Sequence, residues 1–322
     1  MNNSTSDTPN TDKSSQRYDA DYCERLIQQV KREAYTSELT LLVNFLKELS
    51  SSFDKDVLLY ASPYVTGSFN LGSDQRASVN DYDLPALASA MKGMGKRDLL
   101  LIVHSSGGDG NAAAQFVEYL RKKYTGKKIT AIVPHKAMSA ATMICMGCDE
   151  IIMSKFASLG PIDPQLNGIP ASSIMLELDR ALKDVDENER RANIWAPRLM
   201  NLPPGIYQLC ENAIKYAEER VSEWLAHYML KGRKPKSTAK SPASIAKWLA
   251  DGTDHKSHGR PLTYDLLKEK GINVILMEDD DDMQNLVMGV FHAFRIFFDN
   301  NPCCKIILNQ DGDGELLIKS KE

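Results

Sequence analysis

The feature that most constrains the fold is the repeated pairing of a short, unbroken apolar run with a helical pattern. The apolar runs lie at residues 57–61, 99–103, 129–133 and 151–153, and the helical patterns lie at 84–94, 111–123 and 138–147. Strands have this continuous apolar character when helices cover both faces of a parallel sheet. The sequence therefore predicts an α/β fold.

Shifts in composition divide the chain into segments around this core. The expected segments are a disordered polar tail at 1–18, an N-terminal helical segment at 19–52, one large domain at 53–310 and a C-terminal tail at 311–322. After the core pattern, helical periodicity recurs at 174–185, 209–229 and 283–298, with short apolar strands at 274–277 and 305–308. The basic, proline-containing stretch at 231–244 predicts a solvated loop, with a substrate-gating lid as the alternative.

Charge and hydropathy limit the classes of function. The chain of 322 residues has 39 basic and 43 acidic side chains, a formal net charge of −4, which gives no general attraction for nucleic acid or an acidic membrane. Its longest apolar stretch, residues 138–147, is far shorter than the roughly 20 residues of a membrane-spanning helix. The N-terminus lacks the pattern of a secretory signal. We therefore expect a cytoplasmic protein with reduced thiols, without a nucleic-acid partner or membrane span.

The first candidate site motif is a glycine-rich turn after the apolar run 99–103. It reads Ser105-Ser106-Gly107-Gly108. Adjacent glycines let backbone amides approach a ligand closely, so the turn could donate hydrogen bonds to an oxyanion. The alternative is a tight turn that only begins the next helix, with Asp109 or Asn111 as its cap.

The second motif places Ser139 where an apolar helix follows the run 129–133. A serine at a strand-to-helix turn has its hydroxyl directed outward, and the helix N-terminus favours developing negative charge. The small Ala137, Ala140 and Ala141 would leave room for a substrate backbone. The alternative is a helix N-cap without a chemical role.

The third motif is SLGPIDPQ at residues 158–165, in which two prolines fix a loop around the lone acid Asp163. By itself it could be a rigid structural turn. Its position after the serine helix and the run 151–153 makes Asp163 a candidate for the same edge of the sheet.

Three spans together resemble the serine dehydrogenase proteinase family. They are LLLIVHSSGGDGNAAAQFVEYLRKK, ITAIVPHKAMSAATMICMGCDEIIM and SLGPIDPQ, and the resemblance continues more weakly to about residue 309. This family is grouped with the Clp protease proteolytic subunit and signal peptide peptidase A in the Clp/crotonase superfamily. The resemblance implies a β-β-α spiral core with added N- and C-terminal helices, and a homo-oligomeric serine peptidase. It also implies an acyl-enzyme on Ser139, with the amides of Gly107 or Gly108 and of Ala140 near the oxyanion.

The resemblance leaves the general base unassigned. Relatives of the Clp subunit carry a histidine near the position of Asp163. Membrane-anchored relatives instead carry a lysine at the head of the next helix, but the corresponding residues 169–174 contain no lysine. Lys215 is a candidate, although its helical position predicts solvent exposure, as does that of Lys183. Asp163, His135 or a group from another subunit are the alternatives.

The remaining clusters predict no metal or cofactor. Cys145 and Cys148 have zinc-like spacing without a second pair, and we interpret them as buried thiols. His255 and His258 could bind a metal, but a polar loop predicts exposed histidines. GGDG is not a dinucleotide-binding fingerprint, so nothing indicates a dehydrogenase.

The predicted partners are a peptide or protein substrate and further copies of the chain. The chain has no ATP-binding loop, so any energy-dependent unfolding would need a separate ATP-dependent unfoldase. Two alternative functions stay open: a crotonase-type acyl-thioester enzyme, and a noncatalytic interaction module that retains the fold. The missing base motivates the second of these.

Overall fold

The computed structural model describes residues 37–63, 75–233 and 240–318. The expected tail at 1–18 lies outside these residues, as does most of the expected N-terminal helical segment. The described part of that segment is helix α2 (Ser37–Phe53). The centre of the basic stretch at 231–244 also lies outside the described residues, so neither the loop nor the lid interpretation is tested.

A seven-stranded sheet organises the fold, in the order β11-β10-β1-β2-β3-β5-β9. The parallel strands are β1 (Asp56–Ala61), β2 (Leu99–His104), β3 (Ile129–Val133), β5 (Glu150–Met153) and β9 (Val274–Leu276), and the antiparallel ones are β10 (Cys303–Asn309) and β11 (Gly314–Ile318). The predicted α/β class is confirmed.

The C-terminal tail expected from residue 311 is wrong for 314–318, which form the edge strand β11. A tight turn makes this pairing possible, because the side chain of Asn309 accepts hydrogen bonds from the amides of Asp311 and Asp313.

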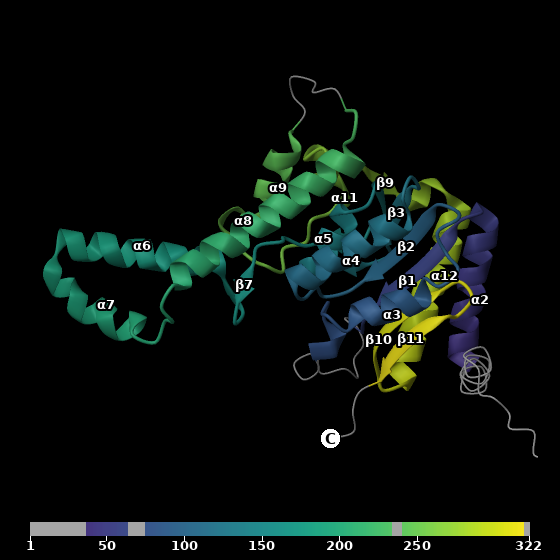
Figure 1. Ribbon diagram of the computed structural model, residues 1–322, viewed down its shortest axis with the longest axis horizontal. Coiled ribbons are helices and arrows are strands. Elements are labelled where there is room, and N and C mark those ends of the chain that lie inside the picture. The colour runs from purple at the N-terminus through teal and green to yellow at the C-terminus, as the bar shows by residue number, and fades with distance from the viewer. Residues whose placement is uncertain (1–36, 64–74, 234–239, 319–322) are drawn as a thin grey trace, which may run out of the picture.

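Helices cover both faces of the sheet (Figure 1). Helices α3 (Asp83–Ala90), α4 (Gly110–Lys123) and α5 (Ala140–Met146) pack on one face, and α2 and α12 (Asp281–Asn300) pack on the other. Successive side chains of β1 are buried on opposite faces of the sheet. Leu58 and Tyr60 lie in the core on the α3–α5 side, and Val57 and Leu59 lie in the core on the α2 and α12 side. This two-sided burial explains the apolar runs without alternation.

A second group of helices extends beyond the sheet. They are α6 (Ala171–Glu187), α7 (Ala192–Leu199), α8 (Ile206–Trp224), α9 (Pro242–Ala250), α10 (Gly252–His255) and α11 (Tyr264–Glu269). Helices α6 and α7 form an arm that projects from the body, and α8 returns from it (Figure 1). The helix expected at 209–229 is α-helical only to Trp224, and Leu225–Met229 form a π-helical turn.

Short elements complete the chain. They are the paired strands β4 (Lys136–Ala137) and β6 (Ser158–Leu159), the hairpin β7 (Gln165–Leu166) and β8 (Ile169–Pro170), and the 3₁₀ turns η1 (Gln75–Ala77), η2 (Glu189–Arg191) and η4 (Met277–Asp279). Among the described residues, no helix is both long and apolar enough to cross a membrane.

A buried ion pair joins β10 to the first residue of α3, and a hydrogen bond joins it to the segment before that helix. Lys305 is fully buried, pairs with Asp83 and donates a hydrogen bond to the carbonyl of Ser78 at 2.6 Å. Tyr60 donates its hydroxyl to the same carboxylate at 2.7 Å. A buried charge is tolerated only with such partners. The network therefore fixes the neighbouring Val79, which contacts the glycine-rich turn.

We expect the protein to lose stability in mild acid because of His104. It is buried, and its Nδ1 donates to the carbonyl of Ser62 at 3.0 Å. Burial, with smaller contributions from His135, Arg295 and Lys136, lowers its pKa from 6.5 to about 4. Between pH 6.5 and about pH 4, His104 is therefore protonated in the unfolded chain but neutral in the folded protein. The free energy of unfolding falls as the pH falls through this range. The expected loss at pH 5 is about 2 kcal/mol.

Denaturant unfolding at pH 7 and pH 5 measures this loss. The control is His104→Asn, whose side-chain amide can still donate to Ser62 but does not titrate. An equal loss of stability in the parent and in this variant would contradict the assignment to His104.

Candidate active site

Ser139 lies between β4 and α5 in a backbone conformation that few residues other than glycine adopt. Its φ is 50° and its ψ is −118°. Such strain persists only where the surrounding structure imposes it, and it is typical of a nucleophile at a sharp strand-to-helix turn. The Ser139 side chain makes no capping hydrogen bond to α5. The N-cap alternative is therefore not supported.

The glycine-rich turn packs directly on Ser139. A Cβ on Gly107 would lie 2.6 Å from the carbonyl of Met138 and 2.7 Å from the Cβ of Ser139, and the φ of Gly107 is +100°. Val79 holds the turn on its other side, because its amide donates to the carbonyl of Gly107 and its carbonyl accepts from Asp109, each at 2.8 Å. Glycine is therefore required at position 107 for both space and conformation.

The same turn also caps a helix, as the alternative interpretation predicted. The Asp109 side chain accepts hydrogen bonds from the amides of Asn111 and Ala112. The Gly107 amide donates to the hydroxyl of Ser105 at 3.1 Å. By contrast, within the described residues the amides of Gly108 and Ala140 make no hydrogen bond. These two amides are the ones that remain available to a ligand.

Asp163 is hydrogen-bonded to His258, a residue that sequence reasoning did not place in the site. The distance from the His258 Nδ1 to the Asp163 Oδ1 is 2.7 Å. The aspartate side chain is 3% exposed and the histidine side chain 29%, so the carboxylate is buried while the imidazole reaches solvent. Since Nδ1 is engaged with the carboxylate, Nε2 is the nitrogen that remains for proton transfer.

Backbone pairing brings the two loops together. Leu159, at the end of β6, forms an antiparallel bridge with Leu262, through hydrogen bonds of 3.0 and 2.9 Å. The amide of Ile162 donates to the carbonyl of Leu249 at 2.8 Å. These contacts align residues 258–262 beside the loop that contains Asp163.

Ser139, Ala140, Gly108, Asp163 and His258 line one cavity of about 600 Å³. Its far wall is α8, which contributes Leu209, Asn212, Ala213, Tyr216 and Ala217. The cavity therefore combines an apolar wall with a serine, a carboxylate–imidazole pair and free amides.

The other candidate bases lie elsewhere. Lys215 is exposed, is paired with Glu211 at 3.1 Å and does not line the cavity. Lys183 is exposed on α6. The ring of His135 stacks on that of His104, with centroids 5.7 Å apart, on the α12 side of the sheet. The structure therefore brings none of these three groups to Ser139.

Two expectations about the minor clusters have different outcomes. Cys145 and Cys148 are buried thiols, as predicted, and burial raises the pKa of each. The expectation of exposed histidines in the 254–258 loop is wrong for His255, which is 2% exposed and bonds to the carbonyl of Trp248. No group of three or more potential metal ligands occurs in the described part of the chain.

We expect Gly252→Ala to slow any reaction that uses the Asp163–His258 pair by about tenfold without destabilising the protein, since a small misplacement of a site residue can cost this much. A Cβ at position 252 would lie 3.0 Å from the Oδ2 of Asp163 and 2.9 Å from the hydroxyl of Ser172. The carboxylate must therefore turn, and the imidazole of His258 loses its orientation. Alanine suits a helix better than glycine, which offsets the strain.

The matched control is Gly259→Ala, where the new Cβ would meet only the Ser257 hydroxyl, at 3.8 Å. Steady-state rates and melting temperatures of both variants check the prediction. Equal rates in the two variants would contradict it.

Fold and site together define a class: an α/β protein with a serine on a strained strand-to-helix turn, in a cavity that free amides and an aspartate–histidine pair also line. The chain belongs to the family of ClpP-like SDH-type serine proteinases, whose model matches residues 84–287. The resemblance in the sequence motifs is thereby confirmed, and the fold is ClpP-like.

Two curated relatives come from Methanocaldococcus jannaschii. The uncharacterized protein MJ1495 is 34% identical over 175 residues, which are 54% of this chain and 51% of that protein. The uncharacterized protein MJ0137 is 29% identical over 237 residues, 72% of each chain. The chain thus spans about half the length of the first of these relatives.

A solved structure, a mutant form of the 1510-N membrane-bound stomatin-specific protease, is 14% identical with a TM-score of 0.36. The match covers 65% of this chain and 79% of that one.

Proposed function

We propose that the protein is a serine peptidase in which Ser139 is the nucleophile, His258 the general base and Asp163 the group that orients the base. The observation that carries this assignment is the 2.7 Å hydrogen bond between Asp163 and His258 in the cavity that Ser139 lines. A nucleophile, a base and an orienting carboxylate are the three roles that such chemistry requires.

In the proposed reaction, the Ser139 Oγ attacks the scissile carbonyl carbon while the His258 Nε2 takes the hydroxyl proton. The amides of Gly108 and Ala140 donate hydrogen bonds to the oxyanion that develops. His258 then gives the proton to the leaving amine, and an acyl-enzyme remains on Ser139. Water, deprotonated by the same imidazole, releases the acid and regenerates the serine. Asp163 orients the imidazole and stabilises the imidazolium.

The Asp163–His258 pair also favours this function over the two alternatives. A crotonase-type thioester enzyme would use the amides but needs no serine nucleophile and no base to activate one. A noncatalytic module was motivated by the missing base, and His258 supplies a candidate for it. The substrate that fits this chemistry is a peptide or protein segment.

The test is covalent labelling by a fluorophosphonate probe, which reacts with an activated serine. We expect one adduct, located on Ser139 by peptide mass spectrometry, and none on the Ser139→Ala variant. No adduct on the folded parent protein at high probe excess would reject the proposal.

The projecting arm supports the expectation of a homo-oligomer. Leu176, Leu182, Ile194 and Met200, on or next to its two helices, are between 55% and 78% exposed, and exposed groups of large apolar side chains mark interaction surfaces. Light scattering of the parent and of a Leu182→Glu, Ile194→Glu variant measures this, and a monomeric parent would contradict it. A separate unfoldase and a cytoplasmic location stay predictions.

A further inference from the structure

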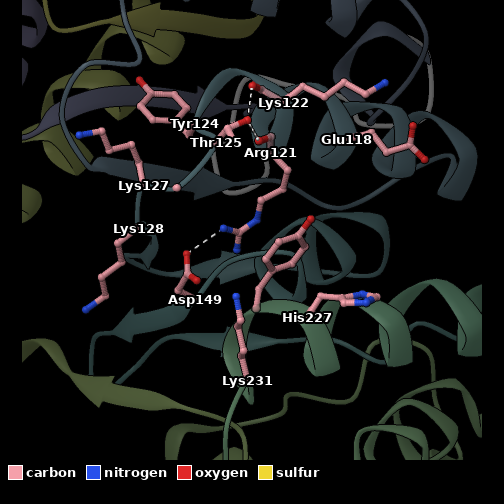
Figure 2. Close-up of a pocket in the computed structure, with 12 residues that line it drawn as sticks. Glu118, Arg121, Lys122, Tyr124, Thr125, Lys127, Lys128, Asp149, His227 and Lys231 are labelled. Carbon is pink, nitrogen blue, oxygen red and sulfur yellow. Dashed lines mark hydrogen bonds and ion pairs between the residues drawn. The ribbon is translucent and has the colours of Figure 1, made fainter.

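We propose that the protein binds a small molecule carrying several phosphate groups, in a basic cavity remote from Ser139. This cavity, of about 650 Å³, lies between the turn that joins α4 to β3 and the end of α8 (Figure 2). Its volume is in the range of small-molecule sites, about 300–1,000 Å³. No residue that lines it also lines the Ser139 cavity.

The two cavities lie at opposite ends of the parallel strands. Lys127 and Lys128 come directly before β3 and line the basic cavity, whereas Ser139 follows the same strand. Asp149 likewise comes directly before β5, a parallel neighbour of β3. A ligand in the basic cavity would therefore not occupy the Ser139 cavity.

The charge of the cavity contrasts with that of the whole chain. Five cationic and two carboxylate side chains line the cavity, a formal surplus of three positive charges, whereas the chain has a net charge of −4. The cations are Arg121, Lys122, Lys127, Lys128 and Lys231, and the carboxylates are Glu118 and Asp149. A concave surface of one sign raises the local concentration of the opposite ion.

A fixed guanidinium lies within this cavity. The Arg121 side chain is only 8% exposed; its Nε donates to the carbonyl of Gly147 and its Nη1 to Asp149, each at 2.8 Å. The ring of Tyr228 lies over it, with the centroid 3.7 Å from Cζ. Its buried Nη2 has no hydrogen-bond partner among the described residues. The site thus includes an ordered charged side chain whose hydrogen-bonding capacity is only partly used by the described residues.

The π-helical turn at the end of α8 forms the opposite wall. It includes His227 and Tyr228 and leads to Lys231, whose side chain points toward Arg121 and Asp149 (Figure 2). Such turns are rare and are frequent at functional sites. Lys122, Lys127 and Lys231 form no ion pair with any described residue, whereas Lys128 pairs with Glu150 at 2.7 Å.

Several ammonium groups around a guanidinium suit a ligand with more than one anionic group. A single carboxylate would leave most of these charges unmatched, while an oligophosphate offers several oxygens to each of several cations. Both a free oligophosphate and a nucleotide have this chemistry.

The experiment is isothermal titration calorimetry of the full chain with tripolyphosphate, ATP and adenosine at physiological salt. We expect both phosphate compounds to bind and adenosine not to bind; tighter binding of ATP than of tripolyphosphate would identify a nucleotide. A Lys127→Gln, Lys231→Gln variant should bind at least about tenfold more weakly, because two charges near the anion are removed. The control Lys47→Gln, on the exposed face of α2, should bind as the parent does.

Three results would overturn the proposal: no binding of either phosphate compound, equal affinity in the parent and the double variant, or tighter binding of an oligoglutamate peptide. The Ser139→Ala variant should bind phosphate as the parent does, so the outcome does not depend on the proposed peptidase activity.

Discussion

Replacing Ser139 with alanine is expected to lower peptide hydrolysis by a factor of about 10⁴ or more, as when other serine hydrolases lose their nucleophile. Among the described residues, Ser139 is the only serine or threonine with a positive φ, and it lines the same cavity as His258. Hydrolysis that remained would come from the oxyanion donors and substrate binding alone.

The same substitution should leave the fold intact. Ser139 makes no capping hydrogen bond, and its neighbour Ala140 already begins the buried helix α5. The cost in stability should therefore be under about 1 kcal/mol, less than for the loss of a functional cap. A Ser139→Gly variant should be more stable than the alanine variant, because glycine accepts a φ of 50° without strain.

Turnover of a peptide substrate and denaturant unfolding, measured on the same preparations, check both expectations. Full turnover by purified Ser139→Ala protein would remove the serine from the mechanism. Loss of turnover together with loss of folding would mean that the side chain is structural.

Replacing His258 with asparagine is expected to lower hydrolysis by about three orders of magnitude or more, comparable to the loss of a general base in a triad. Asparagine can donate its side-chain amide to Asp163, in place of the His258 Nδ1 that lies 2.7 Å from it. It has no group that can accept the serine proton. The buried carboxylate therefore keeps a partner, and only the proton transfer is lost.

The matched comparison is Lys215→Ala. This lysine is exposed and paired with Glu211 on the solvent side of α8, so its loss should leave turnover unchanged within about twofold. Steady-state rates of the two variants across pH 5 to 9 decide between the bases. The reverse result, with Lys215→Ala inactive and His258→Asn active, would replace the proposed triad with a serine–lysine pair.

Much of the fold was predictable because its signals are local. The apolar runs at 99–103 and 129–133 correspond to β2 and β3, and the helical pattern at 111–123 corresponds to α4. The edge strand β11 was missed because its apolar run, residues 316–318, is short and follows the polar stretch 311–315, and pairing with β10 makes it a strand.

The sequence by itself determined the α/β class, the glycine-rich turn and the positions of Ser139 and Asp163, because residues near one another in the chain define strand ends and turns. The tertiary structure decided the partner of Asp163. His258 lies 95 residues further along in a polar loop, and no spacing rule connects the two. They meet because the backbone of Leu159 pairs with that of Leu262, a contact that forms only when distant segments satisfy each other's hydrogen bonds.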